Sequence, residues 1–367
     1  MTETMFTYIN EEYETNKSVL KNRKKNLNEF IKLTKNKKYD EWVVLATGSS
    51  ANAVECAKYY VEKILKINIE MKMPFVFSNY STSINENALY IGVTQGGHSF
   101  STIEALKKVN NTNANVVSLT ANLNSEVCEL CNAVIDIGCG KEKVGYVTKG
   151  FSATVLTFML MGLELAYENN IITELKYNEE LCKFEEAINN IENIIKKSLH
   201  WYEDKKNELI DSQKMVCIGY GPGYGVAREA DTKITETVRI PMSGHELEEY
   251  MHGPYLSLSN KDHIIFIETK NELEYRQSKL RLYLSEYTDY TYKITYKNYS
   301  DNNRDLPLGV DIDELISPLL FAIPIQILSY FLAEDKGNNL NKKIFEDFDD
   351  KLKSKIYQYY RGGEFKC

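Results

Sequence analysis

Short runs of apolar residues alternate with amphipathic segments in the first half of this chain. Residues 42–46 and 88–93 are two such runs, and each precedes a turn of small residues and a segment with apolar positions at helical spacing. Residues 115–119 and 133–137 predict two further strands. Buried strands that alternate with helices form parallel sheets covered on both faces, and their crossovers are right-handed. The pattern therefore predicts an α/β fold.

The same pattern returns about 170 residues later. Residues 215–219 predict a strand, 220–225 a glycine-rich loop, 226–237 a helix, 263–267 and 292–296 two strands, and 273–284 the helix between them. A strand, loop and helix that open both halves indicate an internal duplication. We predict two three-layer αβα sandwich domains, each with a flavodoxin-like parallel sheet.

The segments between these units complete the predicted organisation. We expect an N-terminal helical segment at 1–40, a first domain at 41–177, a connecting helix at 178–212, a second domain at 213–335 and a C-terminal tail at 336–367. The apolar stretch from Phe151 to Tyr167 is interrupted by Ser, Thr and Gly and is short for a membrane span. It predicts a buried core helix, and we expect no membrane partner.

Composition narrows the class of protein. The chain has 367 residues, 43% of them hydrophobic, and a formal net charge of -8, which is typical of a soluble globular protein and disfavours nucleic-acid binding. No secretory signal is visible, and seven scattered cysteines favour a reducing cytoplasm. Cys128 and Cys131 form a lone CxxC with Cys139 nearby, but a zinc site would need a further ligand. We predict no metal site.

Two hydroxyl-rich loops follow successive predicted strands. Thr47 to Ser50 and Thr94 to Ser99 each lead into a helix, where free backbone N–H groups favour phosphate binding. The alternative is that these residues only cap helices. The loop from Gly219 to Gly225 lacks the G-x-G-x-x-G pattern, and the chain has no P-loop, which disfavours a dehydrogenase and a P-loop enzyme.

A carboxylate and an imidazole follow the second glycine-rich loop. Glu236 lies on a predicted helix and His252 at a Gly-Pro turn, and such a pair can move a proton between adjacent sugar carbons. Lys233 and Glu229 share the helix face of Glu236, although an exposed ion pair would give the same spacing. His245 and His252 do not match a known metal-binding spacing.

Five motifs occur in an order that resembles the double-SIS (sugar isomerase) family, over about residues 40–335. They are Thr47–Ser50, Thr94–Ser99, the Glu-x-x-Gly-x-x-Thr-Lys stretch from Glu142 to Phe151, the helix from Ala227 to Glu236, and His252-Gly-Pro254. The family includes the isomerase half of glucosamine-6-phosphate synthase and deglycases of phosphorylated fructosamines.

The resemblance implies roles for individual residues. It assigns phosphosugar binding to Ser49, Ser50, Thr94, Gln95, Gly97, Ser99, Thr148 and Glu229, and catalysis to Glu236, His252 and Lys233. Glu236 would be the general base at C1/C2, and His252 the acid, often supplied by the neighbouring subunit. The resemblance therefore implies a homodimer with a shared active site, a small sugar phosphate as substrate and no cofactor.

At three places the sequence differs from that of glucosamine-6-phosphate synthase, and these differences favour another activity. Gly96 replaces a serine, His98 replaces a carboxylate, and the tail lacks the synthase's terminal sequence and its lysine. We also expect no glutaminase activity. We therefore predict a deglycase, isomerase or deaminase acting on an amino-linked sugar phosphate. The acidic cluster of Glu246, Glu248 and Glu249 could face a cationic amine. The alternative is a phosphosugar-binding regulatory protein without catalytic activity.

Overall fold

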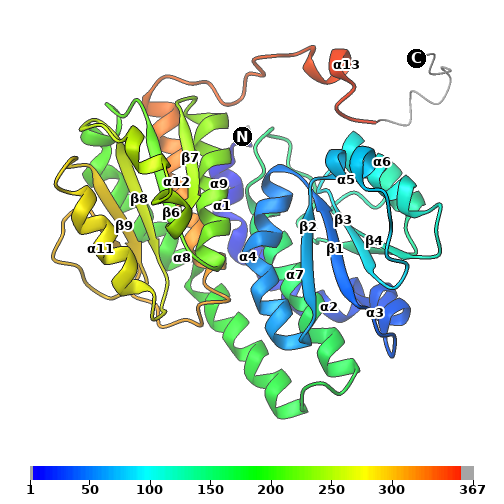
Figure 1. Cartoon of the computed structure of the whole chain (residues 1–367). Coiled ribbons are helices and arrows are strands. Elements are labelled where there is room, and N and C mark those ends of the chain that lie inside the picture. The colour runs from blue at the N-terminus through cyan, green and yellow to red at the C-terminus, as the bar shows by residue number, and fades with distance from the viewer. Residues whose placement is uncertain (1–2, 357–367) are drawn as a thin grey trace.

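The computed structural model describes residues 3–356, and within this range the chain forms two similar α/β units (Figure 1). The first unit contains a five-stranded sheet in the order β2-β1-β3-β4-β5, with all neighbouring strands parallel. Its strands are β1 (Glu41–Ala46), β2 (Asn68–Lys72), β3 (Leu89–Val93), β4 (Asn115–Thr120) and β5 (Ala133–Asp136).

The second unit repeats this topology. Its sheet has the order β10-β9-β8-β6-β7 and is also fully parallel. The strands are β6 (Met215–Gly219), β7 (Met242–Glu246), β8 (His263–Glu268), β9 (Thr291–Thr295) and β10 (Leu306–Pro307). In both units the second strand of the chain lies at one edge, beside the first strand, which is the flavodoxin-like order. The predicted duplicated α/β fold is confirmed.

Helices cover both sheets and join them. Around the first sheet lie α4 (Gly48–Leu65), α5 (Pro74–Tyr80), α6 (Phe100–Val109), the 3₁₀ helix η1 (Glu126–Leu130) and α7 (Lys149–Glu168). Around the second lie α9 (Pro222–Thr237), α10 (Leu247–Tyr250), η2 (Pro254–Ser257), α11 (Glu274–Leu284) and α12 (Pro318–Asp335). The long helix α8 (Glu174–Leu209) connects the two units, and its bounds lie close to those of the predicted connecting helix at 178–212. The limits of the two domains stay predictions.

Three edge strands were missed by the sequence prediction: β2, β7 and the two-residue β10. Only Ile69 of β2 is buried, and every residue of β7 is partly exposed, so neither strand carries the apolar run of a central strand. A further difference concerns the predicted loop at 220–225, because α9 already begins at Pro222. Gly225 lies in this first turn, where a Cβ atom would come within 2.6 Å of the backbone nitrogen of Cys56. The glycine permits close packing of α9 against α4.

Two apolar helices form the centre of the molecule. α7 and α12 are long and apolar enough to cross a membrane by length and composition, but 94% and 78% of their most apolar windows are buried inside the protein. The only strongly charged residue in the apolar stretch of α7, Glu164, is paired with Arg23 at 2.7 Å. The predicted core helix at 151–167 is confirmed.

The N-terminal segment, predicted to be helical, consists of α1 (Met5–Asn10), α2 (Glu12–Asn26) and α3 (Asn28–Thr34). They pack against α7, α8, α12 and β5. The C-terminal tail passes from α12 back across the first unit and includes α13 (Phe348–Leu352) (Figure 1).

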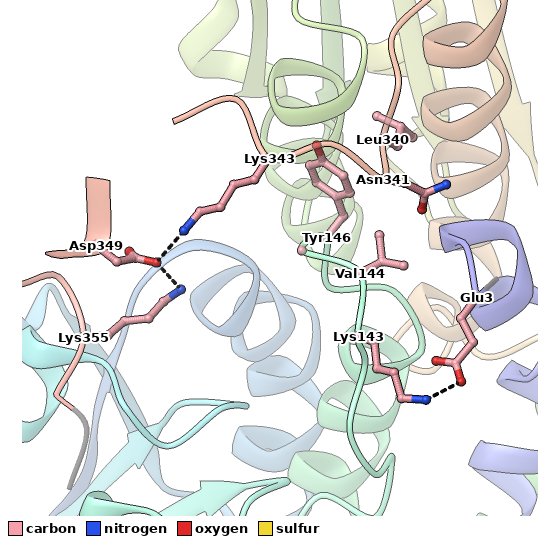
Figure 2. Close-up of a pocket in the computed structure, with 10 residues that line it drawn as sticks. Glu3, Lys143, Val144, Tyr146, Leu340, Asn341, Lys343, Asp349 and Lys355 are labelled. Carbon is pink, nitrogen blue, oxygen red and sulfur yellow. Dashed lines mark hydrogen bonds and ion pairs between the residues drawn. The ribbon is translucent and has the colours of Figure 1, made fainter. Parts of the chain in front are cut away.

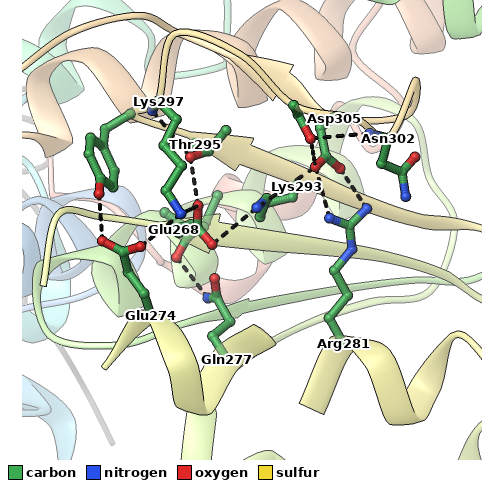
Figure 3. Close-up of polar contacts among 12 residues, drawn as sticks. Glu268, Glu274, Gln277, Arg281, Lys293, Thr295, Lys297, Asn302 and Asp305 are labelled. Carbon is green, nitrogen blue, oxygen red and sulfur yellow. Dashed lines mark hydrogen bonds and ion pairs between the residues drawn. The ribbon is translucent and has the colours of Figure 1, made fainter. Parts of the chain in front are cut away.

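Buried charges close the second sheet at the ends of β8 and β9 (Figure 3). Glu268 is fully buried and accepts hydrogen bonds from Thr295 Oγ1 at 2.7 Å and from Lys293 Nζ at 3.1 Å. Arg281 of α11 holds Asp305, just before β10, through both guanidinium nitrogens. Because each charge is paired, this network fixes the strand ends.

Candidate active site

The first hydroxyl-rich segment lies where β1 passes into α4. Thr47 is the N-cap residue, so Gly48, Ser49 and Ser50 form the first helical turn instead of a loop. The backbone N–H groups of this turn have no helical partner and are available to an anion. Ser49 is buried and its hydroxyl donates to Glu229 of α9 at 3.0 Å, whereas Ser50 is partly exposed. The two serines therefore have different surroundings.

The second segment, Thr94 to Ser99, connects β3 to α6 as predicted. Gly97 has a positive φ of 74°, and a Cβ atom there would lie 1.8 Å from Ser125 Oγ, so only glycine fits. Thr94 is buried, and Ser99 is the N-cap residue of α6. The loop thus presents hydroxyls and the start of a helix at the same edge of the sheet as Ser50.

The side chain of His98 is partly buried beside this loop. Its Nδ1 atom is hydrogen-bonded to Glu126, and its Nε2 atom lies 3.2 Å from the side chain of Asn122. The imidazole at this departure from the family pattern is therefore held by η1 and by the segment after β4.

The stretch from Glu142 to Thr148 lies next to Gln95. Glu142 accepts a hydrogen bond from Gln95 Nε2 at 2.5 Å and another from the Thr148 backbone N–H at 3.1 Å. Burial raises the pKa of Glu142, although both of these hydrogen bonds oppose the shift. Thr148 is fully buried, and its hydroxyl donates to the carbonyl of Tyr146 instead of facing a ligand.

Three charged residues align on the face of α9 that packs against α4. Lys233 is only 1% exposed, and its ammonium lies 2.7 Å from Glu236 Oε2 and 3.7 Å from Glu229 Oε1. Burial alone would lower the pKa of Lys233, but the two carboxylates outweigh it and raise that pKa. Glu236 is 43% exposed. The alternative of an exposed ion pair is wrong, because the lysine and Glu229 are buried.

Residue Asn52 belongs to this cluster and was not predicted. Its side-chain amide donates to Glu229 Oε2 at 2.9 Å and to Thr232 Oγ1 at 2.9 Å. Together with Ser49 it joins the start of α4 to α9, and burial raises the pKa of the Glu229 carboxyl that they hold. Asn52 lies three residues after Ser49, so helical spacing from the first motif could have identified it.

No hydrogen bond or ion pair joins His252 to Glu236 within the described residues. His252 is exposed in the turn after α10, and Glu236 has Lys233 as its side-chain partner in the described range. In the acidic cluster of Glu246, Glu248 and Glu249, two carboxylates already have partners within the chain. Glu246 caps α10, and Glu248 forms an ion pair with Arg276 at 2.6 Å. His245 lies on β7, where burial lowers its pKa.

No group of three or more potential metal ligands occurs among residues 3–356. Cys128 and Cys131 are free thiols at η1, hydrogen-bonded to the carbonyls of Asn122 and Val127 respectively. Burial raises the pKa of Cys131 and that of Cys139 to about 12, so neither thiol is activated.

A pocket of about 720 Å³ lies between Glu3, the loop after Glu142 and the C-terminal tail (Figure 2). It is lined by Glu3, residues 143–146, Leu340, Asn341, Lys343, Asp349 and Lys355. Its three lysines are paired with Glu3 or Asp349. The predicted site residues do not line it, but the tail reaches their second loop, because Ile356 N–H donates to the carbonyl of His98.

Comparison with known proteins supports the architecture and the family. The sequence profile of the SIS domain matches residues 33–164. The chain is 28% identical over 313 residues to a glutamine–fructose-6-phosphate aminotransferase (isomerizing) of Buchnera aphidicola, covering 82% of this chain and 49% of the relative. The chain thus spans about half the length of the curated relatives it matches.

Two solved structures resemble the whole chain. The C-terminal domain of glucosamine-fructose-6-phosphate aminotransferase from Francisella tularensis shares the fold, with a TM-score of 0.82 at 19% identity over 92% of this chain and 98% of that one. A protein described as a phosphosugar isomerase from Clostridium difficile 630 is 30% identical, with a TM-score of 0.89 over 96% of this chain and 98% of that one. The chain therefore belongs to the family of SIS-domain proteins related to phosphosugar isomerases.

Proposed function

We propose that this chain is a cytoplasmic enzyme that transfers a proton between C1 and C2 of an amino-linked ketose or aldose 6-phosphate. The observation that carries the proposal is the continuous link from Ser49 through Glu229 and Lys233 to Glu236. This link joins the hydroxyl-rich start of α4, suited to a phosphate, to a partly exposed carboxylate suited to a general base.

The substrate class follows from the chemistry of this pair. In a 1-amino-1-deoxyketose 6-phosphate, Glu236 would remove a proton from C1 and give a 1,2-enaminol. Return of the proton to C2 gives the imine of the aldose, and water then releases the free amine and an aldose 6-phosphate. His252 would deliver the proton to the leaving group. An isomerase or a ketosamine-phosphate deaminase would use the same first step.

Lys233 supports the proposed base by its charge. Its buried ammonium lies 2.7 Å from Glu236 Oε2 and donates a hydrogen bond to that oxygen, which orients the carboxylate. Glu229 keeps that ammonium charged from the other side, and Ser49 and Asn52 hold Glu229. The cluster therefore holds the proposed base in position.

The test is release of hexose 6-phosphate and free amine from a panel of fructosamine 6-phosphates and amino sugar 6-phosphates. Glu236→Gln keeps the shape of the side chain but cannot accept a proton, so turnover should be lost while phosphosugar binding persists. Unchanged turnover would remove Glu236 as the base. Binding of the panel without turnover by the unaltered chain would favour the alternative, a regulatory phosphosugar-binding protein.

We further propose a homodimer in which His252 of one subunit completes the site of the other. The exposure of His252, and the pairing of Glu236 with Lys233 and not with His252 among the described residues, support this arrangement. Mixing inactive Glu236→Gln and His252→Asn variants should then restore about a quarter of the activity, since random exchange gives half mixed dimers with one intact site each. A mixture that stays inactive while mixed dimers form would place both residues in one chain.

A further inference from the structure

The side chain of Gln95 is held by its nitrogen end. Its Nε2 atom donates to Glu142 Oε2 at 2.5 Å and lies 3.7 Å from Cys139 Sγ. Its Oε1 atom accepts no hydrogen bond from the part of the chain that the structure describes. A primary amide has two N–H donors and one carbonyl acceptor. The donors of Gln95 are therefore used inside the protein, and the acceptor remains.

As a carboxylate, Glu142 cannot reverse this arrangement, because both of its oxygens only accept. Its Oε1 atom accepts from the backbone N–H of Thr148 at 3.1 Å, and a backbone N–H can only donate. Behind the amide of Gln95 lies Gly150, where a Cβ atom would come within 2.1 Å of Nε2 and 2.9 Å of Oε1. The orientation of the Gln95 amide is thus set by the backbone at the start of α7, through Glu142.

We propose that Glu142 is a positioning residue that turns the carbonyl oxygen of Gln95 toward the ligand, so that Gln95 selects a sugar hydroxyl and not the phosphate. This inference rests on the proposed function. A phosphate monoester near neutral pH presents mainly acceptor oxygens, which a carbonyl oxygen repels, whereas a hydroxyl can donate to it. The phosphate is then left to the hydroxyls of Ser50, Thr94 and Ser99 and to the helix starts beside them.

The structure predicts what Glu142→Gln does. The new amide must keep its oxygen toward the Thr148 N–H, so its NH₂ group faces Gln95. Two NH₂ groups cannot hydrogen-bond each other, so the Gln95 amide must rotate and present Nε2 to the ligand. The substitution therefore exchanges an acceptor for a donor at the ligand while preserving shape. Glu12→Gln, which changes a buried carboxyl that does not contact Gln95, is the matched control.

The experiment measures dissociation constants of the full-length protein for two probes. Glucitol 6-phosphate carries hydroxyls, and its binding is titrated directly. Ethyl phosphate lacks hydroxyls, and its binding is measured by competition against glucitol 6-phosphate at up to high millimolar concentration. We expect Glu142→Gln to raise the dissociation constant for glucitol 6-phosphate by about five- to tenfold, which corresponds to the loss of one hydrogen bond. The dissociation constant for ethyl phosphate should stay unchanged or fall slightly. Glu12→Gln should leave both constants unchanged.

A cycle with Gln95→Ala separates positioning from a general effect on the loop. If Glu142 acts through Gln95, adding Glu142→Gln to Gln95→Ala should cause no further loss of glucitol 6-phosphate affinity. Equal weakening of both probes, additive losses, or unchanged affinity for glucitol 6-phosphate would overturn the inference and leave the proposed function standing. Failure of the unaltered protein to bind either probe would overturn both.

Discussion

A buried carboxyl group at the start of α2 provides a strong test of the described packing. Glu12 is fully buried, and neither of its oxygens has a hydrogen-bond partner among residues 3–356. Two acceptor oxygens nearby, Asn16 Oδ1 and Gln326 Oε1, are also unpartnered. Burial raises the pKa of Glu12 to about 8, against opposing effects of Gln326 and Ser152. A proton on Glu12 would supply a donor that this cluster lacks.

The pH dependence follows from that pKa. An ordinary glutamate has a pKa of 4.5, so between pH 4.5 and about 8 the folded state holds a proton that the unfolded state has lost. Stability must then fall as pH rises through this window and become level above it. The full difference corresponds to about 4 to 5 kcal/mol. Glu12→Gln removes the titrating group and should abolish this part of the slope.

The assay is urea unfolding of both proteins at pH 6 and pH 9, followed by circular dichroism and fluorescence together. Between these values the unaltered protein should lose about 2 to 3 kcal/mol more stability than Glu12→Gln, because other titrating groups are common to both. Parallel pH profiles would refute the reasoning and would mean that Glu12 is solvated or paired.

Two further substitutions test the packing interface between α4 and α9. Lys233→Met leaves Glu229 buried without its counter-charge and should cost about 3 kcal/mol in chemical unfolding, part of which Glu229→Gln should restore in the double variant. Gly225→Ala places a methyl group 2.6 Å from the backbone nitrogen of Cys56 and should cost about 1 to 3 kcal/mol. Gly145→Ala, where a Cβ atom meets nothing within 4 Å, should leave the melting temperature unchanged.

The fold was predictable where burial produces a local sequence signal. The central strands β1, β3, β6 and β8 are apolar runs because helices cover both of their faces. These runs made the internal duplication predictable from the sequence. β7 carries Met-Ser-Gly-His-Glu and has a neighbour on one side only. Its pairing with β6 is decided by the preceding helix α9 and not by its own composition, so no local pattern marks it.

The site was predictable residue by residue but not contact by contact. Sequence motifs pointed to Ser49 and Gln95 as ligand-binding groups, yet the structure commits the Ser49 hydroxyl to Glu229 and the Gln95 amide to Glu142. These contacts join segments 47 to 180 residues apart, and periodicity reports only neighbours within a few turns. Which polar atoms remain for a ligand therefore depends on tertiary packing.

The duplication raises the question of why the second half should not bind a phosphate in the same way. The positions equivalent to the first unit's two loops are the turn at Gly221, before α9, and the segment after β8. Both converge on the carboxylate of Glu314, which accepts from Thr269 Oγ1 at 2.9 Å and from Asn271 Nδ2 at 2.5 Å. Glu314 Oε1 also lies 3.7 Å from the Cβ position of Gly221.

An internal carboxylate thus takes the place that an anionic ligand would need, and its charge opposes a second anion there. The second unit is left with a different task. The face of its first helix, α9, that packs on α4 carries Glu229, Lys233 and Glu236 toward the first unit. Duplication followed by closure of one loop pair would therefore leave the one composite site proposed above, with the proposed binding groups from one half and the proposed base from the other.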